Sequence, residues 1–386
     1  MATFGVGFVS RPLGGVLLGA YADRFGRKPA MTLTIGLMAV STAAIGLLPT
    51  YAQIGVIAPI LLVCARLVQG FAAGGELGAS TMFLFESSAP GRRARNGSWQ
   101  LASQGVAGVM VGLIGFALAR SMSEAALYDW GWRVPFLLGV LIAPVGIYIR
   151  RKVDETHDVA KAHHSTKGVL SELLRNNWSN LLLAIAMFSG VTITQYFLGY
   201  MTTFALTSLH MPATTAMLVG FVIGVSTFVF ALAGGWLADR FGLMATAFWP
   251  RVLLVFAAYP AMMIVVGLQT PTSLLTVAAL LMVPQAISGA ITALVVAYAF
   301  PPAIRATGLA TALGIGAALF GGTAQVVIAA LIGFTGDPLS PVWYVIAMNI
   351  VSAIAALVLL RRKSSDAAEG NNDAAHLLLR KAPRLA

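Results

Sequence analysis

The chain is poor in the residues that build disulfide frameworks, metal clusters and charged protein surfaces. Its 386 residues include one cysteine, Cys64, and five histidines, while charged residues make up 10% and apolar residues 58%. A single cysteine excludes a disulfide framework, and Cys64, inside an apolar run, is expected to be a small packing residue. Soluble domains carry about 25% charged residues. The composition therefore predicts a polytopic membrane protein.

Sequence patterns of catalysis are also missing. The chain has no Gly-x-x-x-x-Gly-Lys-Ser/Thr loop, no His-Glu-x-x-His pair and no Gly-x-Ser-x-Gly turn. These patterns cradle nucleotide phosphates, bind catalytic zinc and present a serine nucleophile, respectively. We therefore expect neither an ATP-driven pump nor an enzyme, and no cofactor. The net charge of +11 suggests nucleic acid only in a soluble protein, and no nucleic-acid partner is expected here.

A short charged segment between two long apolar runs occurs twice. The first copy is Gly19-Ala20-Tyr21-Ala22-Asp23-Arg24-Phe25-Gly26-Arg27-Lys28, and the second is Gly235-Trp236-Leu237-Ala238-Asp239-Arg240-Phe241-Gly242. Each flanking run has the apolar length that a bilayer core of about 30 Å requires of a helix. The charged segments are therefore predicted to be tight loops between spans. Their recurrence predicts that one half of the chain repeats the other.

Eleven apolar runs are long enough to be spans. If the loop with Asp23 is cytoplasmic, most of the 25 Lys and Arg residues lie on that side, only Arg120 and Arg133 lie outside, and three lie within spans. The positive-inside rule then fixes the orientation, with a cytoplasmic C-terminus. The expected spans are 1–22, 30–48, 55–86, 97–119, 133–149, 178–207, 214–237, 245–267, 273–299, 307–332 and 342–360.

The loop pattern Gly-x-x-x-Asp-Arg-x-Gly-Arg-Lys, repeated in the second half, resembles the major facilitator superfamily of secondary transporters. Further stretches resemble its metabolite:proton symporter branch, and most of all its citrate and tricarballylate symporters. The branch moves citrate, 2-oxoglutarate, shikimate and betaines. The stretches are Gly5-Val6-Gly7-Phe8-Val9-Ser10-Arg11-Pro12-Leu13-Gly14-Gly15, Arg66-Leu67-Val68-Gln69-Gly70, Gly75-Glu76-Leu77-Gly78, Ser98-Trp99-Gln100, Trp130-Gly131-Trp132-Arg133-Val134-Pro135-Phe136, Phe320-Gly321-Gly322 and Thr335-Gly336-Asp337.

The resemblance implies an all-α polytopic membrane protein with two pseudo-symmetric helical bundles around a central cavity. Family members have twelve spans, so the first span is expected to be missing, through a late start or a truncation. We expect an N-terminal bundle at 1–149, a cytoplasmic linker at 150–177, a C-terminal six-helix bundle at 178–360 and a cytoplasmic tail at 361–386. A solvated linker is favoured over a metal site for His157, His163 and His164, because no ligands of fixed geometry lie nearby.

Charged residues inside spans are the first candidates for function, because an ionisable group at mid-membrane is costly unless it is paired or hydrated. Arg11 lies near mid-span, before Pro12 and two glycines that can open the helix, and its guanidinium offers a fork to a carboxylate. In the family, this position resembles a substrate-carboxylate contact. The alternative is an arginine that pairs with a structural acid or reaches the membrane edge.

Glu76 is the favoured proton-coupling residue, with a structural hydrogen bond as the alternative. It lies between Gly75 and Gly78, where helices or a substrate can come close, and a carboxyl group that gains a proton loses the cost of a buried charge. Arg66 shares its span but is ten residues, or about 15 Å, away, so the two are not expected to pair. Arg251 lies near the start of its span, and snorkelling to the cytoplasmic face explains it as well as function does.

Uncharged polar residues on two spans are the remaining candidates for substrate binding. They share helix faces by the i, i+4 rule, and their amides and hydroxyls suit the oxygen-rich faces of a hydroxy acid. The competing interpretation is hydrogen bonding between helices. These candidates are Gln100 and Gln104 on one span, and Gln195, Tyr196 and Tyr200 on the other.

Charged residues of the repeated loops are expected to form a gate that closes the cytoplasmic side. Surface ion pairs contribute only about 0 to 1 kcal/mol each, so a network that rearranges between two states is needed to shift occupancy. The alternative is that they are ordinary positive-inside residues. We assign Asp23, Arg27, Glu86 and Arg93 to one network, and Asp239, Arg240 and Arg305 to a weaker counterpart.

The sequence thus predicts proton-coupled symport of an organic acid, citrate or a related tricarboxylate, by alternating access. The expected partners are the organic anion, the proton and the lipid bilayer, and a monomer in a bacterial inner membrane is expected. Two alternatives stay open: a carrier of 2-oxoglutarate, shikimate or betaine, because one arginine serves any carboxylate, and a membrane receptor or scaffold that has the same fold without transporting.

Overall fold

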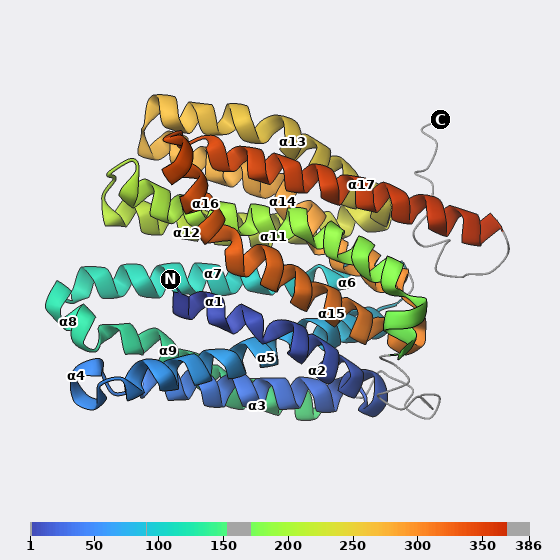
Figure 1. The fold of residues 1–386 in the computed structure, drawn as a ribbon, viewed down its shortest axis with the longest axis horizontal. Helices are drawn as coiled ribbons and strands as arrows, with labels where there is room; N and C mark the ends of the chain where they lie inside the picture. Colours follow the sequence, from blue (N-terminus) through green and yellow to red (C-terminus); the bar gives the residue numbers. More distant parts are fainter. Residues whose placement is uncertain (1, 90, 153–170, 369–386) are drawn as a thin grey trace. The chain divides into compact units, whose positions relative to one another are not determined.

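The protein is helical throughout the part that the computed structural model describes, which is residues 2–89, 91–152 and 171–368 (Figure 1). Within these ranges there is no strand, and nine helical segments are long and apolar enough to cross a membrane. The all-α polytopic class is therefore confirmed. The nine segments are α3 (Arg27–Gly46), α5 (Ile57–Glu86), α6 (Arg93–Gly97) with α7 (Trp99–Ser121), α11 (Trp178–Thr207), α12 (Ala213–Phe241), α13 (Leu243–Leu268), α14 (Pro271–Ala299), α15 (Arg305–Gly316) with α16 (Gly322–Thr335), and α17 (Ser340–Ala368).

Two expected spans are not among these nine segments. The run 1–22 is divided between α1 (Ala2–Val9) and α2 (Arg11–Phe25), and the run 133–149 lies in the 19-residue helix α9 (Val134–Lys152). The number of eleven spans therefore stays a prediction. Shorter helices connect the long ones: α4 (Tyr51–Ile54) and α8 (Glu124–Asp129).

The expected span 307–332 is longer and less regular than its hydropathy suggests. Between α15 and α16 the helix widens into a π-helical turn at Ala317–Gly321. This turn follows Gly314-Ile315-Gly316, ends at Gly321 and is followed by Gly322, so glycines flank it on both sides. The span therefore consists of two α-helical parts separated by a π-helical turn.

The helices form two compact units, each assembled from separate segments of the chain. The first unit comprises Met1–Glu86, Ile114–Leu181 and Pro301–Gly322, and the second comprises Ser87–Leu113, Leu182–Phe300 and Thr323–Ala386. The expected bundles at 1–149 and 178–360 are continuous, and that division stays a prediction.

The linker and the tail are described only in part. Of the linker 150–177, residues 153–170 lie outside the described ranges, and with them His157, His163 and His164, while Glu172–Asn176 forms a π-helical turn. Of the tail 361–386, α17 continues to Ala368 and the rest is not described.

Close contacts between α2, α5 and α15 build the core of the first unit. At Gly15 of α2, a Cβ atom would lie 2.5 Å from the carbonyl oxygen of Ala310 in α15, and at Gly78 of α5 it would lie 2.6 Å from the Ala310 Cβ. Only glycine lets three helices approach this closely. The glycine-rich sequence of these helices thus places the charged ends of α2 and α5 beside the start of α15.

Helix α14 is the centre of the second unit. Most of its side chains between Ser273 and Ala299 are buried, and it packs against α12 and α13. Helix α7 meets α12 at Gly105, where a Cβ atom would lie 2.5 Å from the amide nitrogen of Phe228. A helix with apolar residues on most of its surface, as α14 has, is expected in the interior of such a bundle.

Candidate functional site

Asp23, Arg27, Glu86 and the first residues of α15 form a charge network in the first unit, in which Asp23 and Arg27 are buried and Glu86 is exposed. We call it the first latch. The Arg27 Nη1 atom donates to Asp23 Oδ1 at 2.7 Å, while Nη2 and Nε donate to the two carboxylate oxygens of Glu86 at 3.0 and 3.3 Å. Asp23 accepts from the amide of Ala306 at 3.3 Å, and from the amide and hydroxyl of Thr307 at 2.8 and 2.6 Å. Asp23 thus joins the end of α2 to the positive start of α15.

The loop sequence explains how these side chains meet. Gly26 has φ 106°, a conformation that other residues rarely adopt, and it lets α3 begin at Arg27 directly after α2 ends. Arg27 is therefore four residues from Asp23 yet lies on a different helix. Asp23 is 2% exposed and Arg27 is fully buried, so water screens their attraction little.

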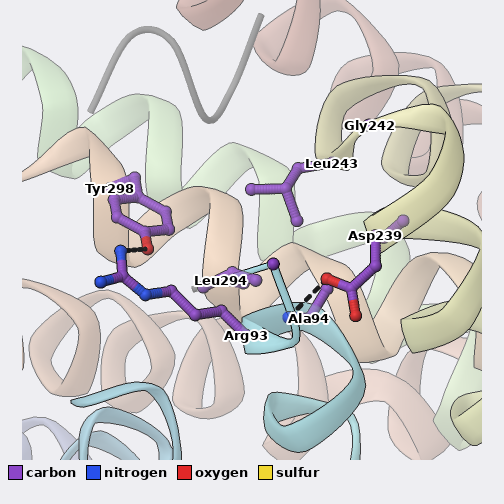
Figure 2. Close-up of a pocket in the computed structure, with 9 residues that line it drawn as sticks. Arg93, Ala94, Asp239, Gly242, Leu243, Leu294 and Tyr298 are labelled. Atoms are coloured by element: carbon purple, nitrogen blue, oxygen red, sulfur yellow. Dashed lines mark hydrogen bonds between the residues drawn. The ribbon is translucent and has the colours of Figure 1, made fainter. Parts of the chain in front are cut away.

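A second network, the second latch, lies in the second unit. Asp239, at the end of α12, accepts from the amides of Ala94 and Arg95 at the start of α6, each at 3.1 Å. Arg93, the first residue of α6, donates from Nη1 to the Tyr298 hydroxyl at 3.1 Å. Figure 2 shows the two contacts on opposite sides of a pocket that Leu243 and Leu294 also line. Gly242 has φ 97° and makes the same kind of turn as Gly26.

The other expected gate residues lie at different places. Arg93 belongs to the second unit and contacts Tyr298, whereas we assigned it to the network of Asp23. Arg240 is exposed and lies over the rings of Trp236 and Phe241, at 5.5 and 5.4 Å. Arg305 begins α15 and so belongs to the first unit, beside the amides that bind Asp23. Asp23, Arg27 and Glu86 do come together, and the gating role of all seven residues stays a prediction.

Arg11 lies at a break in the first apolar run. The residue before it, Ser10, separates α1 from α2, and its hydroxyl donates to the carbonyl of Leu67 in α5 at 2.7 Å. Pro12 occupies the first turn of α2, where proline is tolerated because the amide needs no partner. The helix therefore opens before Arg11 rather than after it.

The Arg11 side chain has free hydrogen-bonding capacity. It is half-buried, its guanidinium lies 4.0 Å from the centre of the Phe8 ring, and its Nε atom is buried with no hydrogen-bond partner among the described residues. A cation held against an aromatic face with an unused donor is suited to binding a carboxylate. Its role in substrate binding stays a prediction.

Glu76 and Arg66 both belong to α5, as expected. Arg66 donates to Gln69 at 3.0 Å, Gln69 donates to Thr42 at 3.0 Å, and the Arg66 guanidinium lies 5.8 Å from the Phe136 ring. Glu76 is half-buried, in the part of α5 whose glycines face Leu18 of α2 and Ala310 of α15. The close approach of helices predicted around Glu76 is present, and its protonation stays a prediction.

The uncharged candidates lie in the second unit. In α7, Gln100 is half-buried and Gln104 is exposed; in α11, Tyr196 and Tyr200 are half-buried. The Gln195 Oε1 atom is buried and has no hydrogen-bond partner among the described residues, which makes Gln195 the candidate with the most evident unused capacity. Arg11 belongs to the first unit and these five residues to the second.

Arg251 does not snorkel, and this is where the sequence interpretation was wrong. It is fully buried, and its guanidinium donates to the hydroxyls of Thr292 in α14 and Ser352 in α17. The α13 ladder of hydrogen bonds lacks a donor at Pro250, beside Arg251. The position of an arginine in an apolar run does not tell whether its side chain reaches water or points into the bundle. Only the hydroxyl residues of α14 and α17 could have indicated this contact.

Two buried amides that the sequence did not single out also lie in the second unit. Asn349 of α17 donates to Thr194 of α11 at 2.8 Å, and Gln285 of α14 donates to the carbonyl of Val191 at 2.8 Å. Together with the hydroxyls that bind Arg251, they link α11, α13, α14 and α17 through hydrogen bonds. Such links between helices are common in membrane bundles.

Known proteins resemble the chain over nearly its whole length. The Major Facilitator Superfamily profile matches residues 1–321. The "Citrate-proton symporter" of Klebsiella pneumoniae is 36% identical over 372 residues, which cover 94% of this chain and 82% of the relative. The "Alpha-ketoglutarate permease" of Escherichia coli (strain K12) is 32% identical over 364 residues, which cover 93% and 83%.

A solved structure of the proton:xylose symporter XylE, bound to 6-bromo-6-deoxy-D-glucose, has the same fold. It superposes with a TM-score of 0.72 at 15% identity and covers 93% of this chain and 86% of that one. At this identity the likeness concerns the fold alone. The profile match, the relatives and the fold agree, and the chain is a multi-pass membrane protein that belongs to the major facilitator superfamily, a family of transport proteins.

Proposed function

We propose that this protein is a proton-coupled symporter of an organic acid, with citrate or a related tricarboxylate as substrate. The observation that carries the proposal is Arg11: a half-buried guanidinium at a helix break, with a buried Nε donor that has no partner among the described residues. The name of the citrate-proton symporter relative supports a carboxylate substrate. The name of the other relative, "Alpha-ketoglutarate permease", supports a wider range of organic acids as substrates.

In this proposal, Arg11 binds one carboxylate of the substrate, while Gln100, Gln104, Gln195, Tyr196 and Tyr200 offer hydrogen bonds to its remaining oxygens. Glu76 carries the coupled proton. A neutral carboxyl group changes its surroundings in the membrane at a lower cost than a carboxylate, so protonation of Glu76 is linked to the direction in which the cavity opens. Both latches hold the cytoplasmic side closed.

The membrane that holds the protein and the orientation of the protein in it are part of the same proposal. We place it in a bacterial inner membrane with the latches and the end of α17 on the cytoplasmic side. The basic residues at the end of α17 support this orientation through the positive-inside rule: Arg361, Arg362 and Lys363.

Uptake of labelled citrate into proteoliposomes tests this function. With an inward proton gradient, citrate is expected to accumulate, and a protonophore is expected to abolish the accumulation. Unlabelled tricarballylate, 2-oxoglutarate and betaine, each added as a competitor, rank the substrates. If betaine prevents the accumulation of citrate and tricarballylate does not, the preferred substrate is a zwitterion and not a tricarboxylate. Failure of every solute to move would favour the receptor or scaffold alternative.

A further inference from the structure

Gln285 of α14 is a buried amide of which only one end is hydrogen-bonded. The residue is 1% exposed, and its Nε2 atom donates to the backbone carbonyl of Val191 in α11 at 2.8 Å. Its Oε1 atom is buried and has no partner among the described residues. The contact with a carbonyl fixes the orientation of the amide, because a carbonyl oxygen attracts the NH2 end and repels the oxygen end. Gln285 therefore presents an acceptor that the described residues do not use.

This oxygen belongs to a side chain that is anchored at the turn of α11 before Gln195. In the ladder of an α-helix, the Val191 carbonyl is the group that accepts from the amide of Gln195, four residues further on. Long side chains of a helix lean toward its N-terminus, so we expect the Gln195 side chain to lean over the turn that contains Val191. Its Oε1 atom is also buried without a partner among the described residues. Two unused amide oxygens thus belong to side chains that meet α11 at one turn.

Helix α7 reaches the same part of α14. At Gly289, one turn after Gln285, a Cβ atom would lie 3.2 Å from the Leu101 Cδ2 atom of α7 and 3.5 Å from the Val191 Cγ1 atom of α11. Leu101 directly follows Gln100, one of the proposed binding residues. These parts of the three helices all belong to the second unit. Gln285 therefore lies among the neutral residues proposed to bind the substrate, although the sequence did not single it out.

The unused atoms of Gln195 and Gln285 determine which chemical group they can bind. An amide oxygen accepts hydrogen bonds and donates none, so it repels a carboxylate and suits a hydroxyl group. A buried acceptor that stays unpaired is costly, so a site with such acceptors discriminates against a ligand that lacks the donor. Citrate carries a hydroxyl group beside its carboxylates, and tricarballylate is the same acid without that hydroxyl. The two acids therefore differ in the one group that these oxygens can recognise.

We propose that Gln285 recognises the hydroxyl group of a hydroxy acid, through an Oε1 atom that accepts from that hydroxyl, with Gln195 Oε1 as the neighbouring acceptor. The inference rests on the proposed function and narrows its substrate from organic acids in general to 2-hydroxy acids. A substrate without the hydroxyl leaves both oxygens unpaired, so citrate is preferred over tricarballylate.

Binding of the two acids to the purified full-length protein tests the proposal, by isothermal titration without a proton gradient. The parent should bind citrate about threefold to tenfold more tightly than tricarballylate, which is the effect of one hydrogen bond between neutral groups. Gln285→Met removes the amide and nearly conserves the volume. It should abolish the preference by raising the Kd of citrate, while the Kd of tricarballylate changes little. A merely structural role of Gln285 would weaken the binding of both acids alike.

Gln69→Met is the matched control, because it makes the same replacement at an amide with both ends in use. Gln69 Oε1 accepts from Arg66 at 3.0 Å, and Nε2 donates to Thr42 at 3.0 Å. This variant should leave the ratio of the two Kd values as in the parent. Gln195→Met, at a half-buried position, is the second test variant and keeps the test decisive if Gln285→Met does not fold. It should lower the preference for citrate in the same direction.

An unchanged ratio of the two Kd values in folded Gln285→Met protein would overturn the proposal, as would equal binding of both acids by the parent. If Gln285→Met does not fold, an unchanged ratio in Gln195→Met overturns it. Proton-driven accumulation of citrate is measured separately, so the proposed function would survive each of these results. A ratio that responds to Gln285→Met in a protein that does not accumulate citrate would refute proton coupling and support the recognition of the hydroxyl. A parent protein that binds neither acid would overturn both proposals.

Discussion

The two compact units differ in how they hold polar groups in their interior. Among the described residues, the first unit contains interior ions that face each other or aromatic rings, such as Asp23 with Arg27 and Arg11 with Phe8. In the second unit the buried polar groups are mostly amides and hydroxyls, and Arg251 is held by two hydroxyls. Under the proposed function, the first unit would therefore recognise the charged substrate and carry the proton, and the second would supply neutral hydrogen bonds.

Glu76→Gln removes the proposed titrating group of the first unit and is expected to abolish accumulation of citrate against a gradient. The variant keeps the shape and hydrogen bonding of a protonated carboxyl group, so exchange of labelled for unlabelled citrate should continue. The measurement is uptake at an imposed pH difference. Glu172→Gln, the same change in the turn before α11, should accumulate citrate normally. Normal accumulation by Glu76→Gln would place the coupling elsewhere.

Arg11→Lys keeps the charge but replaces a planar fork by a point-like ammonium, so citrate binding should weaken about tenfold to a hundredfold. Isothermal titration of the purified protein measures the Kd. Arg24→Lys, in the same helix at an exposed position, is the control and should bind as the parent does. An unchanged Kd in folded Arg11→Lys protein would mean that Arg11 does not grip a carboxylate.

Asp23→Asn and Asp239→Asn compare the latches directly. Asp23 holds both Arg27 and the start of α15, so its loss of charge should slow turnover about fivefold, whereas Asp239→Asn should slow it about twofold. Exchange rates at saturating citrate give the turnover, and Kd should change little in either variant. If Asp23→Asn bound citrate much more weakly yet turned over normally at saturation, it would be a binding residue.

Arg251→Lys tests whether the buried cation of the second unit only joins helices. A lysine reaches Thr292 and Ser352 less well together than a guanidinium does, so the unfolding temperature should drop by roughly 2 to 4 °C with citrate affinity unchanged. Arg240→Lys, at an exposed site, should leave both unchanged. A tenfold loss of citrate affinity at an unchanged unfolding temperature would mean that Arg251 binds the substrate, so that the second unit also recognises charge.

The smallest expected effects are those of Gln104→Ala and Gln195→Ala, which compare two of the neutral binding candidates. Gln104 is exposed, so loss of its hydrogen bond to citrate should raise the Kd only about twofold, while removal of Gln195, whose Oε1 is buried, should raise it about threefold to tenfold. Equal effects in titration would show that burial in the unliganded protein does not identify the binding amides.

The sequence predicted the helices well because their signals are local. Apolar length located every long helix, and α11 runs from Trp178 to Thr207 as expected. The sequence also placed Asp23, Arg27 and Glu86 in one network, and these three side chains lie together. Long-range partners were harder, since which helix start receives Asp23 depends on packing between α2 and α15, more than 280 residues apart along the chain.

Arg251 shows why contacts in the interior of the protein escape sequence reasoning. Its position in the run permits both an outward and an inward side chain, and the choice depends on hydroxyls from two other helices. The same limit applies to Tyr298, which becomes informative only when its contact with Arg93 is known. Residues whose partners come from distant segments cannot be ranked from one sequence.

Helix α2 carries two of the charged candidate residues, one near each end. Arg11 is the first residue of α2 and Asp23 lies in its last turn, twelve residues or about 18 Å further along the axis. The helix is unbroken between these two residues, and Ser10 separates it from α1. Under the proposed function, a substrate bound to Arg11 would pull on one end of a helix whose other end carries the carboxylate that holds α15.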